Sequence, residues 1–216
     1  MDLLNKSLLK DKCYINGEWI DSYSKETIDV NNPSSLEIIA KVPKCGKDET
    51  HYAIRKANEA WGDWKNRPAI ERSAFLRKWF NLIESNQEDL AKIMTLEQGK
   101  PLAEARGEIA MANSYVEWNA EEAKRVYGDI IPDRLTDRRV VVIKQPVGVV
   151  GAITPWNFPS AMITRKCSPA LAVGCPVVLK PASQTPLSAF ALAVLAEEAG
   201  FPKGVFNLVN GDGAGV

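Results

Sequence analysis

The sequence predicts an α/β protein in which helices cover both faces of a parallel sheet. From residue 147 onward, segments that are apolar almost throughout alternate with segments of helical pattern. Near-continuous apolar strands are typical of parallel sheets, because both faces of such a sheet are buried. The expected order is strand, helix, strand, helix, strand, over residues 147–154, 160–173, 176–181, 186–200 and 204–211.

The N-terminal segment predicts extended structure. Asn16 and Gly17 stand between β-forming residues in "YINGEWI", residues 14–20, and this pattern is a strong hairpin signal. Extended chain is expected to continue to residues 38–43, "IIAKVP".

Helices are expected next. Residues 49–65 and 69–84 carry apolar side chains at helical spacing, and "EDLAKIMTLEQGK" predicts a helix that ends near Gly99. Pro101 suits the first turn of a long helix that reaches about Tyr127. We assign the aromatic residues of these helices to the core, because helical spacing favours packing over a ligand site. The first two apolar stripes comprise Ala53, Ile54, Ala57, Ala60, Trp61 and Trp64, and then Ile70, Phe75, Leu76, Trp79, Phe80 and Ile83.

The pattern changes near Gly128. Residues 128–147, "GDIIPDRLTDRRVVVIKQPV", combine β-branched residues with turn residues and predict two extended strands outside the helical layer. A boundary between residues 1–127 and residues 147–216 is therefore expected in this segment.

Composition excludes several classes of function. The 216 residues are 45% hydrophobic, and 27 basic residues balance 27 acidic ones, so no global charge favours nucleic acid. No run reaches the roughly 18 apolar residues of a membrane-spanning helix. The N-terminus lacks the apolar core of a signal peptide, so a cytoplasmic protein without membrane contact is expected.

The cysteines predict reduced, inert thiols. Cys13, Cys45, Cys167 and Cys175 form no C-x-x-C pair, and neither of the last two has a histidine nearby in the sequence. The one histidine, His51, is expected on a solvated helix. This argues against a histidine-based metal site and against a Ser-His-Asp triad, and we expect no metal.

A stiff turn, "TPWNFP", follows the first parallel strand at residues 154–159. Each proline fixes its own φ and pushes the preceding residue to extended geometry. A stiff turn can hold one side chain still, and Asn157 is the candidate, because its amide can donate two hydrogen bonds. A purely structural loop is the alternative interpretation of this segment.

Two further segments are expected at the same edge of the sheet. Ligands of such sheets bind at the carboxyl ends of the strands. Lys180 and Ser183 follow the second strand, and "NGDGAG", which contains Gly213, follows the third. Glycines there let backbone amides approach a phosphate, whereas a glycine-rich turn and a lysine that reaches solvent are the structural alternatives.

Arg165 lies eight positions after Asn157, on the helix that follows the stiff turn. A guanidinium can bind a carboxylate with two hydrogen bonds. The alternative is a surface ion pair, and spacing alone favours that interpretation.

Several motifs together resemble the aldehyde dehydrogenase superfamily, and nearly the whole chain takes part in the resemblance. They are "INGEW", "NNPSS", "TLEQGKPLAEARGEI", "YGDIIP", "TPWNFP", "ITRK", "PALAVGCPVVLKPASQTPLSA" and "AGFPKGVFNLVNG". The segments "FPSAMITRKCSPALAVGC" and "KPASQTP" look most like the succinate-semialdehyde dehydrogenase branch.

The resemblance implies a fold and an activity. The fold is the N-terminal half of the family's fold: a hairpin and helical layer at 1–127, part of an oligomerisation arm at 128–146, and an incomplete Rossmann-like cofactor domain at 147–216. The activity is oxidation of a small acidic aldehyde, succinate semialdehyde above all, through a thiohemiacetal.

Site residues also follow from the resemblance. Asn157 matches the asparagine that stabilises the oxyanion, and Arg165 matches the arginine that binds the substrate carboxylate. The cofactor side is lined by Ile153, Thr154, Pro155, Trp156, Lys180, Ser183 and Gly213. NAD-preferring relatives often carry glutamate at the position of Ser183, so serine implies NADP, with NAD as the alternative cofactor.

The chain departs from the family pattern in one large respect. The family's catalytic cysteine and general-base glutamate lie beyond the position that matches Val216, so the sequence is expected to be truncated and inactive alone. The expected partner is a second copy of the chain in a homo-oligomer when the protein is complete, or otherwise a chain that supplies the missing half. The alternative is a non-catalytic module that binds a nucleotide or pairs with homologous subunits.

Overall fold

A five-stranded sheet forms the centre of the chain in the computed structural model, which describes residues 3–213 and 215–216. Its order is β2-β1-β9-β8-β7, in which β7, β8 and β9 are parallel and the β1–β2 hairpin is antiparallel. The predicted α/β class with a parallel sheet is therefore confirmed. The strands of this sheet are β1 (Cys13–Ile15), β2 (Glu18–Ile20), β7 (Val150–Ile153), β8 (Val177–Lys180) and β9 (Phe206–Leu208).

The predicted N-terminal hairpin is present, and it adds to the parallel sheet. Asn16 and Gly17 have φ values of 54° and 75°, as a tight two-residue turn of a right-twisted hairpin requires. Tyr14 pairs with Leu208, so β1 covers the edge of β9. A separate ribbon is formed by β3 (Thr27–Asn31) and β4 (Ile38–Pro43).

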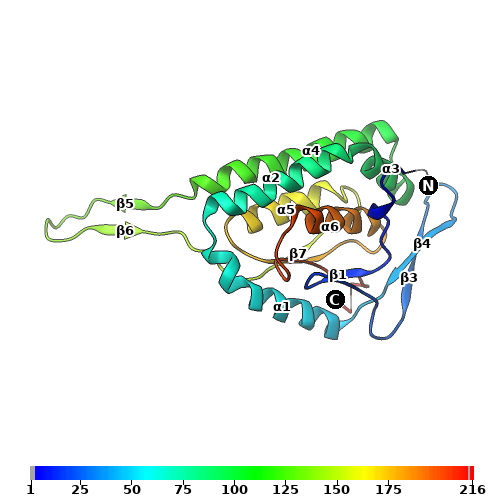
Figure 1. Ribbon diagram of the computed structural model, residues 1–216, viewed down its shortest axis with the longest axis horizontal. Coiled ribbons are helices and arrows are strands. Elements are labelled where there is room, and N and C mark those ends of the chain that lie inside the picture. Colours follow the sequence, from blue (N-terminus) through cyan, green and yellow to red (C-terminus); the bar gives the residue numbers. More distant parts are fainter. Residues whose placement is uncertain (1–2, 214) are drawn as a thin grey trace.

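Helices lie on both faces of the sheet (Figure 1). One face is covered by α1, and the other by α5 and α6, which connect the parallel strands. Behind α5 and α6 lies a second helical layer of α2, α3 and α4. The bounds are α1 (Lys47–Asn66), α2 (Ala69–Ser85), α3 (Gln87–Gln98), α4 (Leu102–Glu122), α5 (Ala161–Ala172) and α6 (Leu187–Ala199).

The long helix α4 is shorter than predicted. It begins at Leu102, directly after Pro101, and ends at Glu122 rather than near Tyr127. A 3-10 turn, η2 (Ala123–Arg125), follows it. Such tightening of the last turn is common where a helix ends without a glycine cap.

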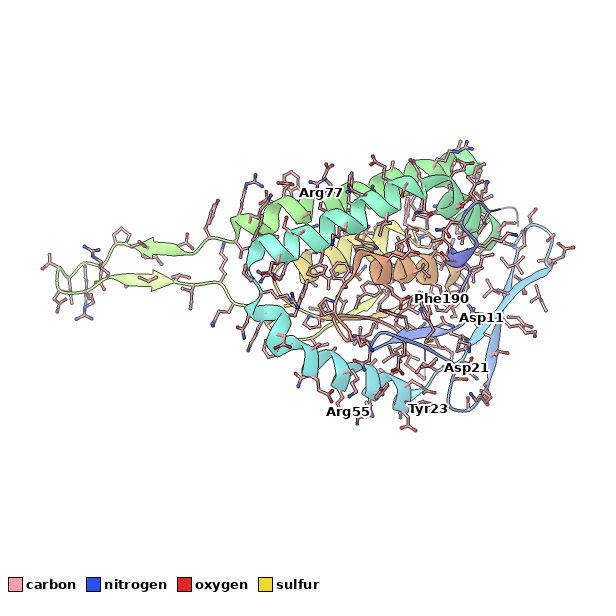
Figure 2. All side chains as sticks on the ribbon, in the orientation of Figure 1. Asp11, Asp21, Tyr23, Arg55, Arg77 and Phe190 are labelled. Carbon is pink, nitrogen blue, oxygen red and sulfur yellow. The ribbon has the colours of Figure 1, made fainter. Side chains whose placement is uncertain are left out.

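The core is rich in aromatic side chains. Trp64 and Trp79 are fully buried, and both contact Phe201 edge-on. The indole nitrogen of Trp79 donates a hydrogen bond to the Leu192 carbonyl at 3.1 Å. In Figure 2, Phe190 lies in the interior of the molecule. These contacts join α1 and α2 to α6 and to the loop that precedes β9.

Four apolar side chains that we assigned to the core are instead exposed. They are Ile54 of α1, Ile70 of α2, Trp118 of α4 and Tyr127. Trp118 and Tyr127 are each 68% exposed. Helical spacing identifies an apolar face, but it does not say whether another element covers that face.

A hairpin of β5 (Asp129–Ile131) and β6 (Val140–Val142) projects from the body, as Figure 1 shows. All six strand residues are exposed. The two strands predicted outside the helical layer are therefore present, while the division of the chain into domains stays a prediction. Within the described ranges, no helix has both the length and the hydropathy needed to cross a bilayer.

Candidate functional site

The carboxyl ends of β7 and β8 are hydrogen-bonded to one another. Ile153 lies opposite Lys180 in the parallel register, and the Thr154 amide donates to the Lys180 carbonyl at 3.1 Å. On the other side of β8, the Val209 amide donates to the Leu179 carbonyl at 2.9 Å. The three segments that the sequence placed at one edge of the sheet are therefore assembled there.

Lys180 is the half-buried last residue of β8. Its ammonium donates to the Pro181 carbonyl at 3.1 Å, which is its one hydrogen-bond acceptor among the described residues. Burial lowers the pKa of Lys180, and the carboxylate of Asp212, in the loop after β9, opposes that shift. Ser183 is half-buried and Gly213 is exposed, so both are accessible at this edge.

The stiff turn places its side chains in contrasting environments. Thr154 is buried, and its hydroxyl has no hydrogen-bond partner among the described residues. Trp156 is 54% exposed. Pro155 and Asn157 are also exposed, and the Asn157 amide forms no hydrogen bond within the described chain. An amide donor is thus presented to solvent from a turn fixed by two prolines.

The N-terminus of the helix after this turn is capped by a side chain of another helix. The first turn of α5 contains no acidic residue, and Ser160 makes no side-chain cap. Instead Glu108 of α4 accepts hydrogen bonds from the backbone amides of Ser160 and Ala161, at 3.0 and 3.2 Å. The Glu108 carboxylate is buried and forms an ion pair with Lys100. A carboxylate at a helix N-terminus satisfies free amides and meets the positive end of the helix dipole.

The helix after β8 is capped in the same manner. Glu97 of α3 accepts from the amides of Leu187 and Ser188, each at 2.7 Å. Burial raises the pKa of Glu97 to about 7, and the hydrogen bonds from Ser188 and Leu187 oppose that shift. Both helices that follow strands of the site are therefore fixed by buried glutamates of the outer helical layer.

A tight turn between α3 and α4 separates Glu97, near the end of α3, from Lys100. Gly99 ends α3 with a φ of 88°, as predicted for the C-cap. A Cβ at Gly99 would lie 2.7 Å from Pro33, so close packing also requires glycine. The turn places Glu97 at the start of α6 and Lys100 near Asn157, whose carbonyl accepts from the Lys100 ammonium at 3.1 Å.

A groove of about 900 Å³ runs along α4 and includes Arg165 of α5. None of the other predicted site residues lines it. The lining is formed by Ser114, Tyr115, Glu117, Trp118, Asn119, Glu121, Glu122, Arg125 and Arg165. Sequence analysis missed the contribution of Tyr115 and Trp118, since their helical spacing matched that of core residues.

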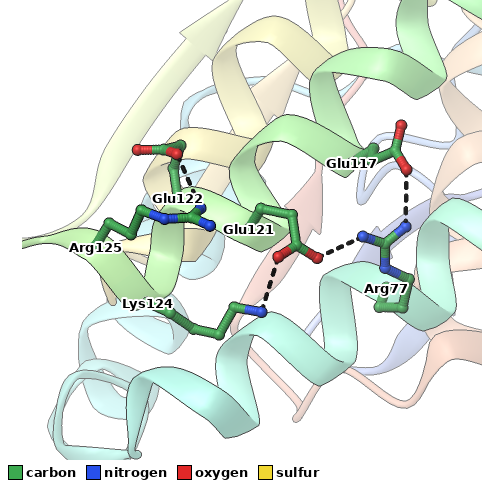
Figure 3. Close-up of polar contacts among 6 residues, drawn as sticks. All are labelled: Arg77, Glu117, Glu121, Glu122, Lys124 and Arg125. Atoms are coloured by element: carbon green, nitrogen blue, oxygen red, sulfur yellow. Dashed lines mark hydrogen bonds and ion pairs between the residues drawn. The ribbon is translucent and has the colours of Figure 1, made fainter.

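The glutamates of the groove are all paired with other cations (Figure 3). Arg77 contacts Glu117 at 3.1 Å and Glu121 at 2.6 Å. Lys124 also contacts Glu121, and Arg125 contacts Glu122. Arg165 is exposed and forms no ion pair or hydrogen bond with any residue that the structure describes. Among the described residues, the surface ion pair that was its alternative interpretation is not present.

The cysteines are all free and all buried. Burial raises the pKa of Cys167 to about 12, which leaves little thiolate at neutral pH. Cys13 and Cys45 lie 3.5 Å apart, and this contact together with burial raises the pKa of Cys45. In the described ranges, no group of three or more His, Cys, Asp or Glu residues could hold a metal ion.

Comparison with known proteins identifies close relatives. A model of the aldehyde dehydrogenase family matches residues 19–216. Glutarate-semialdehyde dehydrogenase of Pseudomonas aeruginosa is 59% identical over 211 residues, covering 98% of this chain and 44% of the relative. Succinate-semialdehyde dehydrogenase (NADP+) of Escherichia coli is 58% identical over 216 residues, covering 100% of this chain and 45% of the relative.

Solved structures share the fold. A crystal structure of an NADP-dependent enzyme of E. coli has a TM-score of 0.98 and 57% identity, covering 99% of this chain and 44% of that one. Succinate-semialdehyde dehydrogenase from Burkholderia pseudomallei has a TM-score of 0.98 and 53% identity, with coverage of 100% and 45%. The chain spans slightly less than half the length of the relatives it matches.

The raised pKa of Glu97 predicts that the free energy of unfolding depends on pH. Its pKa is about 7 in the folded chain, against an ordinary value of 4.5, so the folded state holds the proton over a wider pH range. The free energy of unfolding should therefore fall by about 3 kcal/mol as the pH rises from about 4.5 to about 7. Urea unfolding at a series of pH values measures this free energy. The fall should occur in the parent and should be absent from Glu97→Gln.

Glu88→Gln provides the control. Arg106 lowers the pKa of Glu88, so this variant should change the slope only below about pH 4.5, where a carboxylate of lowered pKa gains its proton. Equal slopes for the parent and Glu97→Gln between about pH 4.5 and about pH 7 would contradict the prediction.

Proposed function

The chain belongs to the aldehyde dehydrogenase family, and we propose that the complete protein oxidises an aldehyde that carries a carboxylate, with succinate semialdehyde as the first candidate. The unpaired guanidinium of Arg165 is the observation that supports this substrate class. The relatives named for succinate semialdehyde and glutarate semialdehyde support it as well.

Arg165 suits a carboxylate because its charge has no partner within the described residues while its glutamate neighbours have partners. A guanidinium can donate two parallel hydrogen bonds to a carboxylate. Trp118 and Tyr115 supply apolar walls next to it for the carbon chain of the substrate. In this proposal the groove receives the acidic end of the aldehyde.

Asn157 would act on the other end of the substrate. When a thiolate adds to the aldehyde carbon, the carbonyl oxygen becomes an oxyanion, and an amide donor placed there lowers the barrier. Asn157 is exposed, its amide is free within the described chain, and its turn is rigid. The thiolate must come from another part of the complete enzyme, because all four cysteines of this chain are buried.

The carboxyl ends of the parallel strands fit a nicotinamide dinucleotide. When bound, this cofactor would accept hydride from the substrate carbon. Lys180 has one hydrogen bond to the part of the chain that the structure describes, so two of its three donors are available there for ribose hydroxyls or phosphate. The buried hydroxyl of Thr154, which has no partner within the described ranges, lies at the same end of the sheet. Ile153 and Trp156 offer exposed apolar surface, and Gly213 leaves space for a close backbone approach.

Ser183 supports NADP as the preferred cofactor. A serine hydroxyl can donate to a 2′-phosphate and carries no charge that would repel it. All four cysteines are free, which fits the reducing cytoplasm that we propose as the location.

The β5–β6 hairpin is the proposed oligomerisation arm. It carries exposed Ile130, Val141 and Ile143 at 74%, 64% and 69% exposure. Exposed β-branched residues on an unpaired strand edge favour pairing with another chain. We therefore propose a homo-oligomer of the complete protein as the assembly, or a partner chain that supplies the missing half.

Asn157→Ala should lower kcat of the complete enzyme by about 10²–10³, because it removes the donor to the oxyanion. The KM for the aldehyde should change little. Steady-state kinetics with succinate semialdehyde measure both. Asn81→Ala, an exposed asparagine of α2, is the control and should match the parent. An unchanged kcat in Asn157→Ala would refute the role of Asn157.

Arg165→Met should raise the KM for succinate semialdehyde by roughly 10–100-fold, the loss expected for a charge-assisted hydrogen-bond pair. The KM for a neutral aldehyde of similar length should change little. Lys166→Met removes one positive charge from the same helix and controls for long-range electrostatics. Equal changes of KM for the acidic and neutral aldehydes would remove the assigned role.

Ser183→Glu should weaken NADP binding at least about tenfold relative to NAD, because the added carboxylate repels the 2′-phosphate. Fluorescence titration of the reduced cofactors measures both dissociation constants, and Ser183→Ala tests the hydroxyl without adding charge. A parent enzyme that binds NAD tenfold tighter than NADP would contradict the proposed preference.

A further inference from the structure

Lys100 connects the α3–α4 turn to the turn that holds Asn157. Its ammonium donates to the Asn157 carbonyl at 3.1 Å and lies 4.6 Å from the ring centroid of Phe158. It also forms the ion pair with Glu108. The Lys100 and Glu108 side chains are only 11% and 2% exposed, so this ion pair lies largely out of solvent, whereas the contact with the Asn157 carbonyl lies at the surface. Screening by water and salt is weak for such a pair.

Glu108 holds the far end of the same segment. One carboxylate oxygen pairs with Lys100, and the other accepts from the amides of Ser160 and Ala161. The pair therefore contacts the backbone on both sides of Pro159. Residues 154–160 contain no regular secondary structure, so these contacts add to the few backbone hydrogen bonds of the segment, which involve Thr154, Phe158 and Ser160.

The Asn157 side chain depends on this backbone for its orientation. Its amide has no hydrogen bond within the described chain, and thus no neighbouring side chain aims it. The two prolines restrict the local dihedral angles, but they do not tie the segment to the rest of the molecule. The Thr154 amide ties the start of the segment to the Lys180 carbonyl, and at Asn157 the backbone carbonyl accepts from Lys100.

We propose that Lys100 and Glu108 act as a positioning pair that sets where the Asn157 amide points in the complete enzyme. This inference rests on the proposed function of Asn157 as the oxyanion donor. A displacement of about 1 Å at a catalytic group can cost on the order of 10²-fold in rate. The pair acts through Asn157 and does not touch the substrate.

The test uses the complete enzyme expressed in its native host. Lys100→Met alone leaves the Glu108 carboxylate buried and unpaired, which destabilises the fold. The double variant Lys100→Met/Glu108→Gln removes both charges together, and the new amide side chain keeps an oxygen for the helix amides. We expect the double variant to fold and to lower kcat at least about tenfold. Its dissociation constant for NADP should stay within about twofold of the parent, since Lys180 and Ser183 are unaltered.

Arg106→Met is the matched control. Arg106 also lies near the start of α4 and also pairs with a glutamate, Glu88, at 2.7 Å, but it contacts no part of the 154–160 turn. It should leave kcat at the parent value. Thermal unfolding of each variant distinguishes a general loss of stability from a specific loss of rate.

Combination with Asn157→Ala gives the decisive comparison. If the pair acts through Asn157, then the double variant should cost little further kcat in the Asn157→Ala background. Parent-like kcat in Lys100→Met/Glu108→Gln, or an equal loss of kcat with and without Asn157, would overturn the positioning role. An unchanged kcat in Asn157→Ala alone would instead refute the proposed function, so the two failures are distinguishable.

Discussion

Two buried carboxylates tie the outer helical layer to the sheet. Glu97 and Glu108 satisfy the first amides of α6 and α5, and neither helix offers a cap of its own. A buried amide left without an acceptor costs about 1–3 kcal/mol. The outer helices α3 and α4 therefore supply acceptors that the crossover helices do not supply for themselves. The parallel sheet and the helical layer form one unit, although they come from distant parts of the sequence.

The same helix, α4, serves two different surfaces. Near its start, Glu108 turns inward to α5, while toward its end Glu117, Glu121 and Glu122 face the groove. Exposed ion pairs contribute little to stability, so the pairs with Arg77, Lys124 and Arg125 matter more for the charge of the groove. They neutralise its carboxylates and leave Arg165 as the cation that an anionic ligand would meet.

Local sequence patterns predicted the local structure well. The Asn16-Gly17 turn, the helical segments, the Gly99 cap and the alternating strands all follow from spacing and turn chemistry. Pairing of β1 with β9 did not follow, because no local pattern specifies a partner so distant in the chain.

The candidate site was predictable only in part. Asn157 and Lys180 stand out by residue type and by their place at or after the end of a strand, and Arg165 stands out by residue type on the helix that follows. The structure puts Lys180 at the carboxyl end of β8 and Arg165 on the groove. Lys100 and Glu108 do not stand out, since Glu108 caps a helix 52 residues away. Trp118 has the spacing of a core residue, and only the tertiary structure reveals that nothing described covers it.

In the proposed reaction, the position of the two substrate contacts has a consequence for selectivity. Asn157 lies four residues before α5 and Arg165 lies one turn into it, so the end of the turn and the first turn of α5 together set the separation of the oxyanion donor and the carboxylate-binding cation. The substrate must span that separation. Succinate and glutarate semialdehyde differ by one methylene, and such a difference supports only about 10–200-fold discrimination in an apolar site. Both semialdehydes are therefore compatible with these contacts, and the choice between them rests on the groove walls beside Trp118 and on residues outside this chain.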